Sequence, residues 1–127
     1  HQIKEGKLEW KFDLNKNQKR LKNQNIGIIG LGRIGTAVGL KVSKIFKKVY
    51  FYDPYLKEGT DKTLDFEKTE SLEELFRKCN VVTIHVPSST KNKFFIKDKH
   101  LSNANKGLIF INTARGDLVR SNTLSKF

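Results

Sequence analysis

The order of hydrophobic and polar positions changes near residue 25. Residues 1–24 are mostly polar, but apolar side chains alternate from Leu8 to Leu14, which predicts a short edge strand or an extended arm. From Asn25 onward, short apolar runs alternate with segments of helical period. We therefore predict a polar lead-in segment, 1–24, followed by one folded domain, 25–127.

Four apolar runs, rich in β-branched and aromatic residues, predict buried strands. They occupy residues 26–29, 49–52, 81–86 and 108–112. Leu64 and Phe66 alternate and indicate a further short strand between the second and third runs. Runs this short and this uniformly apolar are typical of parallel strands that are covered on both faces.

Helical spacing fills the intervals between these runs. Apolar residues recur every three or four positions after the first run, which predicts one buried helix face made of Ile34, Val38, Val42 and Ile45. The short segment 72–76 has a similar face, and its first turn follows Ser71, which is three residues before Glu74. This spacing predicts a capping box, in which each side chain bonds the other residue's backbone amide.

Two shorter helices complete the pattern. One is expected within residues 96–101, and Asp117 is expected to cap another near the end of the sequence. Strands that alternate with helices predict the α/β class and a doubly wound parallel sheet with helices on both faces. Ligands of such sheets bind at the carboxyl ends of the strands, so the residues that follow each strand are the candidates for chemistry.

Composition narrows the class of protein. A chain of 127 residues supports one domain, and no apolar run approaches the roughly 20 residues of a transmembrane helix. A lone cysteine, Cys79, excludes an internal disulfide and favours a reducing compartment, the cytoplasm. No Cys/His cluster has the spacing of a metal site, so we expect none. Because methionine is absent, we expect a fragment or a processed piece.

The net charge of +12 allows two interpretations. The 25 basic residues outnumber the 13 acidic ones, but most are lysines scattered along the chain. A solvated basic surface is the simpler interpretation, and a footprint for a phosphate backbone is the alternative. We expect no nucleic-acid partner, because the charges neither cluster nor alternate with aromatic residues.

The first strand leads into a glycine-rich turn, 30–35, of the form GxGxxG. Gly30 permits a tight turn, Gly32 lets the backbone approach a pyrophosphate, and Gly35 allows close packing of helix on strand. The amino end of the following helix supplies free N–H groups to phosphates, and Arg33 could add a contact. This context favours a dinucleotide site in a Rossmann sheet over a simple tight turn.

Asp53 ends the second strand, where a carboxylate can accept hydrogen bonds from both ribose hydroxyls of an adenosine. A 2′-phosphate at about 4 Å would be repelled by about 4 kcal/mol at an effective dielectric of about 20, so NAD is favoured over NADP. The alternative is a turn aspartate before Pro54.

The ends of the last two strands supply further candidates. Val86 and Pro87 would form an apolar wall beside adenine, and the hydroxyl residues 88–90 could reach phosphate or ribose. For His85 we favour a structural role, because no nucleophile is adjacent. Arg115 follows the last strand, where its planar fork can hold a substrate carboxylate and polarise a carbonyl; a surface salt bridge is the alternative.

Four motifs in order resemble the NAD-binding domain of the D-isomer-specific 2-hydroxyacid dehydrogenases. They are GIIGLGRIG at 27–35, YDPY at 52–55, HVP at 85–87 and NTARGDLV at 112–119. The stretch 51–56 is especially similar to the branch of the family that contains dehydrogenase-like co-repressors. The resemblance implies a Rossmann fold, NAD as cofactor, interconversion of D-2-hydroxy acids and 2-oxo acids, and a homodimer in the intact protein.

The resemblance also assigns residues. Arg115 matches the family's catalytic arginine, whereas the family's Glu and proton-donating His lie farther along than this sequence extends. We therefore expect a Rossmann domain truncated on its C-terminal side, inactive alone, from an enzyme; an NAD-sensing, co-repressor-like binding module is the alternative. The predicted cofactor contacts are Gly30, Gly32, Arg33, Ile34, Gly35, Asp53, Val86, Pro87, Ser88, Thr90, Asn92, Thr113, Ala114 and Arg115.

Overall fold

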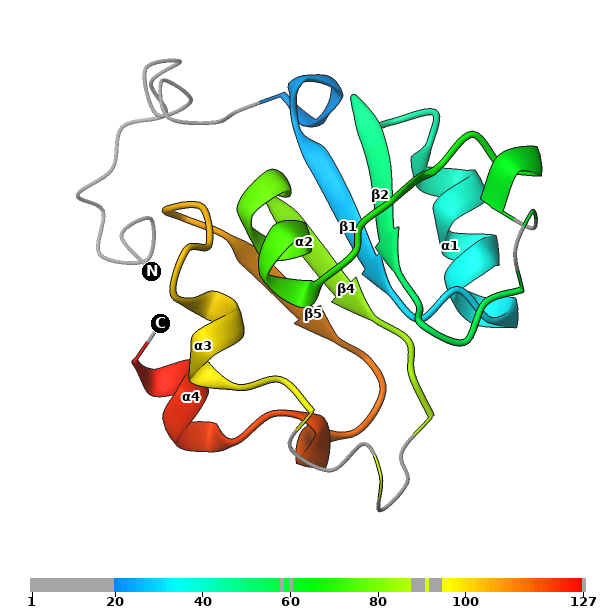
Figure 1. Ribbon diagram of the computed structural model, residues 1–127. Helices are drawn as coiled ribbons and strands as arrows, with labels where there is room; N and C mark the ends of the chain where they lie inside the picture. The colour runs from blue at the N-terminus through cyan, green and yellow to red at the C-terminus, as the bar shows by residue number, and fades with distance from the viewer. Residues whose placement is uncertain (1–19, 58, 60, 88–90, 92–94, 127) are drawn as a thin grey trace, which may run out of the picture.

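A parallel β-sheet organises the chain (Figure 1). The computed structural model describes residues 20–57, 59, 61–87, 91 and 95–126. Within them, five parallel strands follow the order β3-β2-β1-β4-β5. The strands are β1 (Asn25–Ile29), β2 (Lys48–Tyr52), β3 (Glu67–Lys68), β4 (Val81–Ile84) and β5 (Ile109–Asn112). The predicted fold class is confirmed; the alternating segment 8–14 lies outside the described residues.

Helices cover both faces of this sheet, as predicted. Figure 1 shows α1 (Arg33–Val42) on one face, and α2 (Leu72–Lys78) with α3 (Asp98–Leu101) on the other. Strand residues alternate between two cores: Phe51 packs on the α1 side, whereas its neighbour Tyr50 packs on the α2 side. This double coverage explains the nearly all-apolar composition of the central strands β1, β2 and β4. The edge strands differ: both residues of β3 are charged and exposed, and Ile109 and Ile111 of β5 are exposed.

The buried face of α1 differs from the predicted one. Ile34 is 67% exposed, and Ile45 lies beyond the end of the helix and is 48% exposed. The buried residues of α1 are instead Gly35 and Gly39. A Cβ atom on Gly39 would lie 2.6 Å from the Phe66 ring, so the helix sits too close to the sheet for larger side chains. Val42 does pack against the core, as predicted, and Val38 is half-buried. The prediction was wrong for Ile34 and Ile45, because it assumed that large apolar residues face inward.

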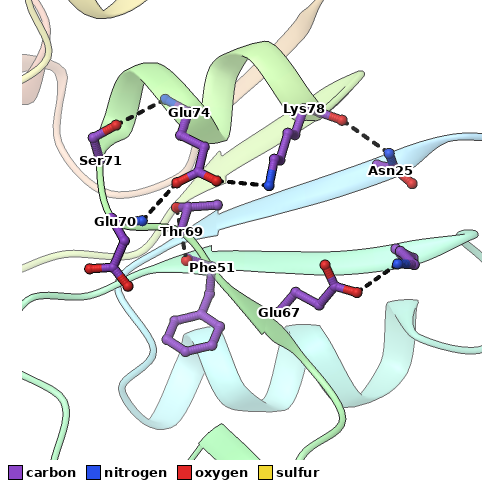
Figure 2. Close-up of polar contacts among 9 residues, drawn as sticks. Asn25, Phe51, Glu67, Thr69, Glu70, Ser71, Glu74 and Lys78 are labelled. Carbon is purple, nitrogen blue, oxygen red and sulfur yellow. Dashed lines mark hydrogen bonds and ion pairs between the residues drawn. The ribbon is translucent and has the colours of Figure 1, made fainter.

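The start of α2 matches the predicted cap in one half only (Figure 2). The Ser71 hydroxyl accepts the Glu74 N–H at 3.1 Å. The Glu74 carboxylate, however, accepts the N–H of Glu70 at 2.9 Å and pairs with Lys78 Nζ at 2.7 Å. The longer glutamate side chain thus reaches one residue further back than the capping box requires. Leu72, Leu75 and Phe76 are buried, as predicted.

Three boundaries also differ from the sequence prediction. The ladder of β4 with β5 ends at Ile84, two residues before the predicted end. β3 begins after Phe66, whose ring is buried against α1. Asp117 lies inside a 3₁₀ turn, η4 (Gly116–Leu118), and α4 (Ser121–Ser125) begins after Arg120. Burial of Val119, which forms a bridge with Ile96, keeps the chain extended between them.

No helix within the described residues is long and apolar enough to cross a membrane. The same part of the chain contains no group of three or more His, Cys, Asp or Glu side chains that could hold a metal ion.

Candidate dinucleotide site

The candidate site lies at the carboxyl edge of the sheet, on either side of β1. Strand register aligns Ile29 with Tyr52 on one side and with Ile84 on the other, and Ile84 with Asn112. The residues that follow these four positions therefore emerge from one edge. Because β1 connects to β2 on one side and borders β4 on the other, this edge is the topological switch point where ligands of open α/β sheets bind.

A cavity of about 540 Å³ occupies this edge. Its lining combines the ends of three strands with the start of α1 and parts of the segment after β4. The residues are Ile29, Gly30, Gly32, Tyr52, Asp53, Pro54, Tyr55, His85, Val86, Pro87, Lys91 and Phe95. The cavity is large enough for a substantial part of a dinucleotide, and its wall is mainly apolar with one carboxylate.

Backbone conformation shapes the glycine-rich loop. Gly30 has a φ of 88°, a backbone conformation that residues other than glycine rarely adopt. Its N–H donates to the Tyr52 carbonyl at 3.0 Å. A Cβ atom on Gly35 would overlap the carbonyl oxygen of Gly30, so α1 and the turn are in direct contact. In contrast, a Cβ atom on Gly32 would meet nothing within 4 Å. The loop is thus closely packed on its inner side and open at Gly32.

The amino end of α1 faces this opening. Gly32 is the N-cap and has no side chain to bond the first-turn amides, so the N–H groups that follow it are available to a ligand. Ten helical residues follow, and their aligned peptide dipoles add a partial positive charge at this end. Arg33 and Ile34 are exposed beside it. This arrangement suits a pyrophosphate.

Asp53 connects the second strand to the glycine-rich loop. One carboxylate oxygen, Oδ2, accepts the Leu31 N–H at 2.9 Å, and the other, Oδ1, accepts the Tyr55 N–H at 2.9 Å. The bond to the Tyr55 N–H is typical of a turn aspartate before Pro54, which was the alternative interpretation of Asp53. The Leu31 bond was not anticipated, and it holds the carboxylate at the mouth of the cavity.

His85 is held by its own strand. Its Nε2 atom lies 3.0 Å from the hydroxyl of the buried Thr83, and its backbone N–H donates to the Ile29 carbonyl at 2.8 Å. Burial lowers the pKa of His85 below its usual range, because it disfavours the charged imidazolium. These contacts fit the structural role that we favoured for this residue.

The loop after β5 emerges from the same edge but does not line the cavity. Thr113, Ala114 and Arg115 are all exposed. Asn112 shapes this loop, since its side chain donates to the Arg115 carbonyl and accepts the Ala114 N–H, each at 3.0 Å. Arg115 is therefore presented on an ordered turn, with its guanidinium facing solvent.

The cavity brings together part of the predicted contact set. Gly30, Gly32, Asp53, Val86 and Pro87 line it, while Gly35 packs beneath the loop. Ser88, Thr90 and Asn92 lie outside the described residues.

Seven residues of the lining were not among the predicted contacts: Ile29, Tyr52, Pro54, Tyr55, His85, Lys91 and Phe95. Tyr52 and Tyr55 lie close to Asp53 in sequence, at or just after the carboxyl end of β2, so their position could have indicated them. Lys91 and Phe95 belong to the segment after β4, which carries no periodic signal in the sequence.

A second cavity, of about 530 Å³, lies between α3 and α4. Its polar wall includes Asp98, whose oxygens accept from the Thr123 hydroxyl at 2.5 Å and from Lys126 Nζ at 2.7 Å. These bonds join two helices and explain why the polar groups gather there. The cavity at the glycine-rich loop remains the candidate site, because it lies at the carboxyl edge of the sheet.

Comparison with known proteins gives a family match over the whole sequence. The model of the D-isomer specific 2-hydroxyacid dehydrogenase NAD binding domain matches residues 1–127. C-terminal-binding protein 1 of Caenorhabditis elegans is 31% identical over 107 residues, which cover 84% of this chain and 15% of that protein. Glyoxylate reductase of Thermofilum pendens is 33% identical over 106 residues, which cover 84% of this chain and 31% of the reductase.

Solved structures agree with this match. The structure of D-2-hydroxyisocaproate dehydrogenase superimposes with a TM-score of 0.82 at 30% identity, covering 98% of this chain and 36% of that one. The chain thus spans about a third or less of the length of these relatives.

Proposed function

The chain belongs to the D-isomer-specific 2-hydroxyacid dehydrogenases, as their NAD-binding domain, and we propose that the complete protein interconverts a D-2-hydroxy acid and a 2-oxo acid. Bound NAD supplies the hydride acceptor, and NADH the donor, at C2 of the acid. The observation that carries the proposal is the cavity where the glycine-rich loop, the start of α1 and Asp53 meet. The tasks of this chain are to hold the dinucleotide and to orient the acid.

The geometry of the loop fits a dinucleotide. The open space beside Gly32 admits a pyrophosphate to the amides at the start of α1, where a larger side chain would occupy that space. Val86, Pro87 and the ring of Tyr55 offer an apolar surface for adenine beside the ribose position. The carboxylate of Asp53 keeps unused lone pairs for the ribose hydroxyls, because an ionised carboxylate can accept about four bonds. The same charge disfavours the 2′-phosphate of NADP.

Arg115 is proposed as the catalytic residue that grips the substrate. Its guanidinium can form two parallel bonds with a carboxylate, or polarise the carbonyl on which negative charge develops. The turn held by Asn112 supports this assignment, because it leaves the Arg115 side chain exposed at the edge where the dinucleotide site lies. The Thr113 and Ala114 contacts to cofactor are proposed on the same basis.

Replacement of Arg115 by alanine in the complete protein tests this assignment. Loss of charged hydrogen bonds worth about 1.5–3 kcal/mol each lowers kcat/KM by about tenfold or more, with NADH and a series of 2-oxo acids as substrates. Arg77→Ala, which removes an exposed arginine on α2, is the matched control and leaves kcat/KM unchanged. Full activity of Arg115→Ala would remove Arg115 from the proposed mechanism.

A second function has one observation in its favour, the 31% identity to C-terminal-binding protein 1. In that case NAD binding would control conformation or assembly, and the output would be protein binding. The series of 2-oxo acids separates the two proposals: turnover of any member supports the enzyme, whereas NADH binding without turnover of any of them supports the binding module. A homodimer and a cytoplasmic location remain predictions for the complete protein.

A further inference from the structure

The glycine-rich loop is restrained by a small number of polar contacts. The Gly30 N–H donates to the Tyr52 carbonyl at 3.0 Å, the Leu31 N–H donates to Asp53 Oδ2 at 2.9 Å, and the Thr36 hydroxyl donates to the Leu31 carbonyl at 3.3 Å. On the outer side of the loop, nothing would contact a Cβ atom on Gly32 within 4 Å. These bonds, and the buried Leu31 side chain, therefore define the conformation of the loop.

Among these contacts, the hydrogen bond from the Leu31 N–H to the Asp53 carboxylate is expected to be the strongest. Its acceptor is an ionised carboxylate, and hydrogen bonds to charged groups contribute more than those between neutral ones. The carboxylate is itself fixed, because its other oxygen accepts the Tyr55 N–H at 2.9 Å. The bond therefore connects the glycine-rich loop to the end of β2, a strand paired along its length with β1.

We propose that Asp53 is a positioning residue, which holds the glycine-rich loop in its dinucleotide-receiving conformation before the dinucleotide binds. This inference rests on the proposed function and extends it, because Asp53 would then contribute to affinity by two routes. One is direct contact with the ribose hydroxyls. The other is ordering of the loop, in which Gly30 and Gly32 would otherwise lose conformational freedom at the moment of binding.

Two ligands distinguish the contribution of ribose contact from the contribution of loop ordering. NADH can use both, whereas an NADH analogue whose adenosine ribose lacks the 2′ and 3′ hydroxyls can use only the ordered loop. Asp53→Asn keeps the size of the side chain, but its amide cannot accept both the Leu31 and the Tyr55 N–H groups. Asp65→Asn is the matched control: Asp65 is exposed, lies before β3 and has a positive φ that asparagine tolerates.

Calorimetric affinities in the full chain give the first result. Asp53→Asn is expected to weaken binding of the dideoxy analogue by about tenfold, and binding of NADH by more, while Asp65→Asn changes neither. This loss runs against simple electrostatics, since removal of a negative charge beside a pyrophosphate favours binding. Asp53→Ser is the second variant, for use if the asparagine variant does not fold. The serine hydroxyl can still accept the Tyr55 N–H but is too short to reach Leu31, so we expect the same loss of affinity.

Amide exchange of Leu31, followed by NMR without ligand, gives the second result. Exchange is expected to accelerate in Asp53→Asn and to be unchanged in Asp65→Asn. Unchanged affinity for the analogue together with unchanged Leu31 exchange, in a variant that binds NADH more weakly, would overturn the positioning role and leave the proposed function intact. Failure of the wild-type chain to bind NADH would instead overturn the proposed function, and this inference with it.

Discussion

A Cβ atom on Gly35 would overlap the carbonyl oxygen of Gly30, so the first turn of α1 and the turn after β1 are in direct backbone contact. Backbone atoms cannot rotate away as a side chain can. Gly35→Ala must therefore displace the helix or the turn, and we expect it to lower the free energy of unfolding by about 3 kcal/mol or more. Chemical denaturation measures this loss, and stability equal to that of the wild type would contradict the close packing.

Gly32→Ala separates binding from folding. Its Cβ atom would meet nothing within 4 Å, so the change in unfolding free energy should stay within about 1 kcal/mol. The added methyl group would occupy the space through which a pyrophosphate approaches the α1 amides, and we expect NADH affinity to fall by about tenfold or more. Gly116→Ala, also in open space, is the matched control. Normal NADH binding by Gly32→Ala would place the phosphates elsewhere.

The lone cysteine should be chemically inert in the folded chain. Cys79 is fully buried against α2 and Gly27, and burial raises the pKa of its thiol to about 12. Because the thiolate is the reactive form, a thiol reagent such as DTNB should label the native protein at pH 8 only at the rate of unfolding. Added denaturant should release one thiol promptly. Rapid labelling without denaturant would show that α2 opens locally.

Stability should fall on mild acidification, with His100 as one cause. Its Nδ1 atom accepts the Lys97 N–H at 2.9 Å at the start of α3, which requires an unprotonated Nδ1. Burial lowers the pKa of His100 from its ordinary value of 6.5, a shift that Glu73 opposes and Lys99 and Lys97 support. Below pH 6.5 the unfolded chain takes up a proton that the folded chain resists. The unfolding free energy therefore decreases from pH 6.5 down to the folded-state pKa.

His100→Gln tests this pH dependence. Glutamine at the third position of a helix can accept the same N–H as part of a capping box, but it does not titrate. Denaturation at a series of pH values from 7 to 5 should give a shallower loss of stability than in the wild type. The remaining slope includes His85, whose pKa is also lowered by burial. An unchanged slope would remove His100 as a contributor.

Strands were predictable from sequence because their apolar runs leave an unambiguous signal. Runs such as 49–52 and 108–112 contain little but apolar residues, and each forms a strand at that place with one residue of difference at an end. Burial on both faces explains this composition for β2, but not for the edge strand β5, where Ile109 and Ile111 are exposed. The face of α1 was not predictable in the same way. Gly35 and Gly39 carry no hydrophobic signal, yet they are the buried residues of the helix, because only glycine permits its close approach to the sheet.

The candidate site also contains some features that the sequence predicts and others that it does not. The positions of the glycines and of Asp53 follow from the order of strand, turn and helix, and the structure places them around one cavity. The bond from Leu31 to Asp53 joins residues 22 positions apart, and its existence depends on the register of β1 with β2. Phe95 likewise reaches the cavity from a segment without periodicity. Such contacts are set by tertiary structure, which a local pattern does not encode.

Titration of the folded chain with NADH in a calorimeter tests the central claim most directly. Circular dichroism on the same sample first establishes that the chain is folded. We predict saturable heat with one NADH per chain, lower affinity for NADPH because of the Asp53 carboxylate, and an NADH affinity about tenfold or more lower in Gly32→Ala. A folded sample that gives no saturable heat with NADH would contradict the assignment of the cavity between the glycine-rich loop and Asp53.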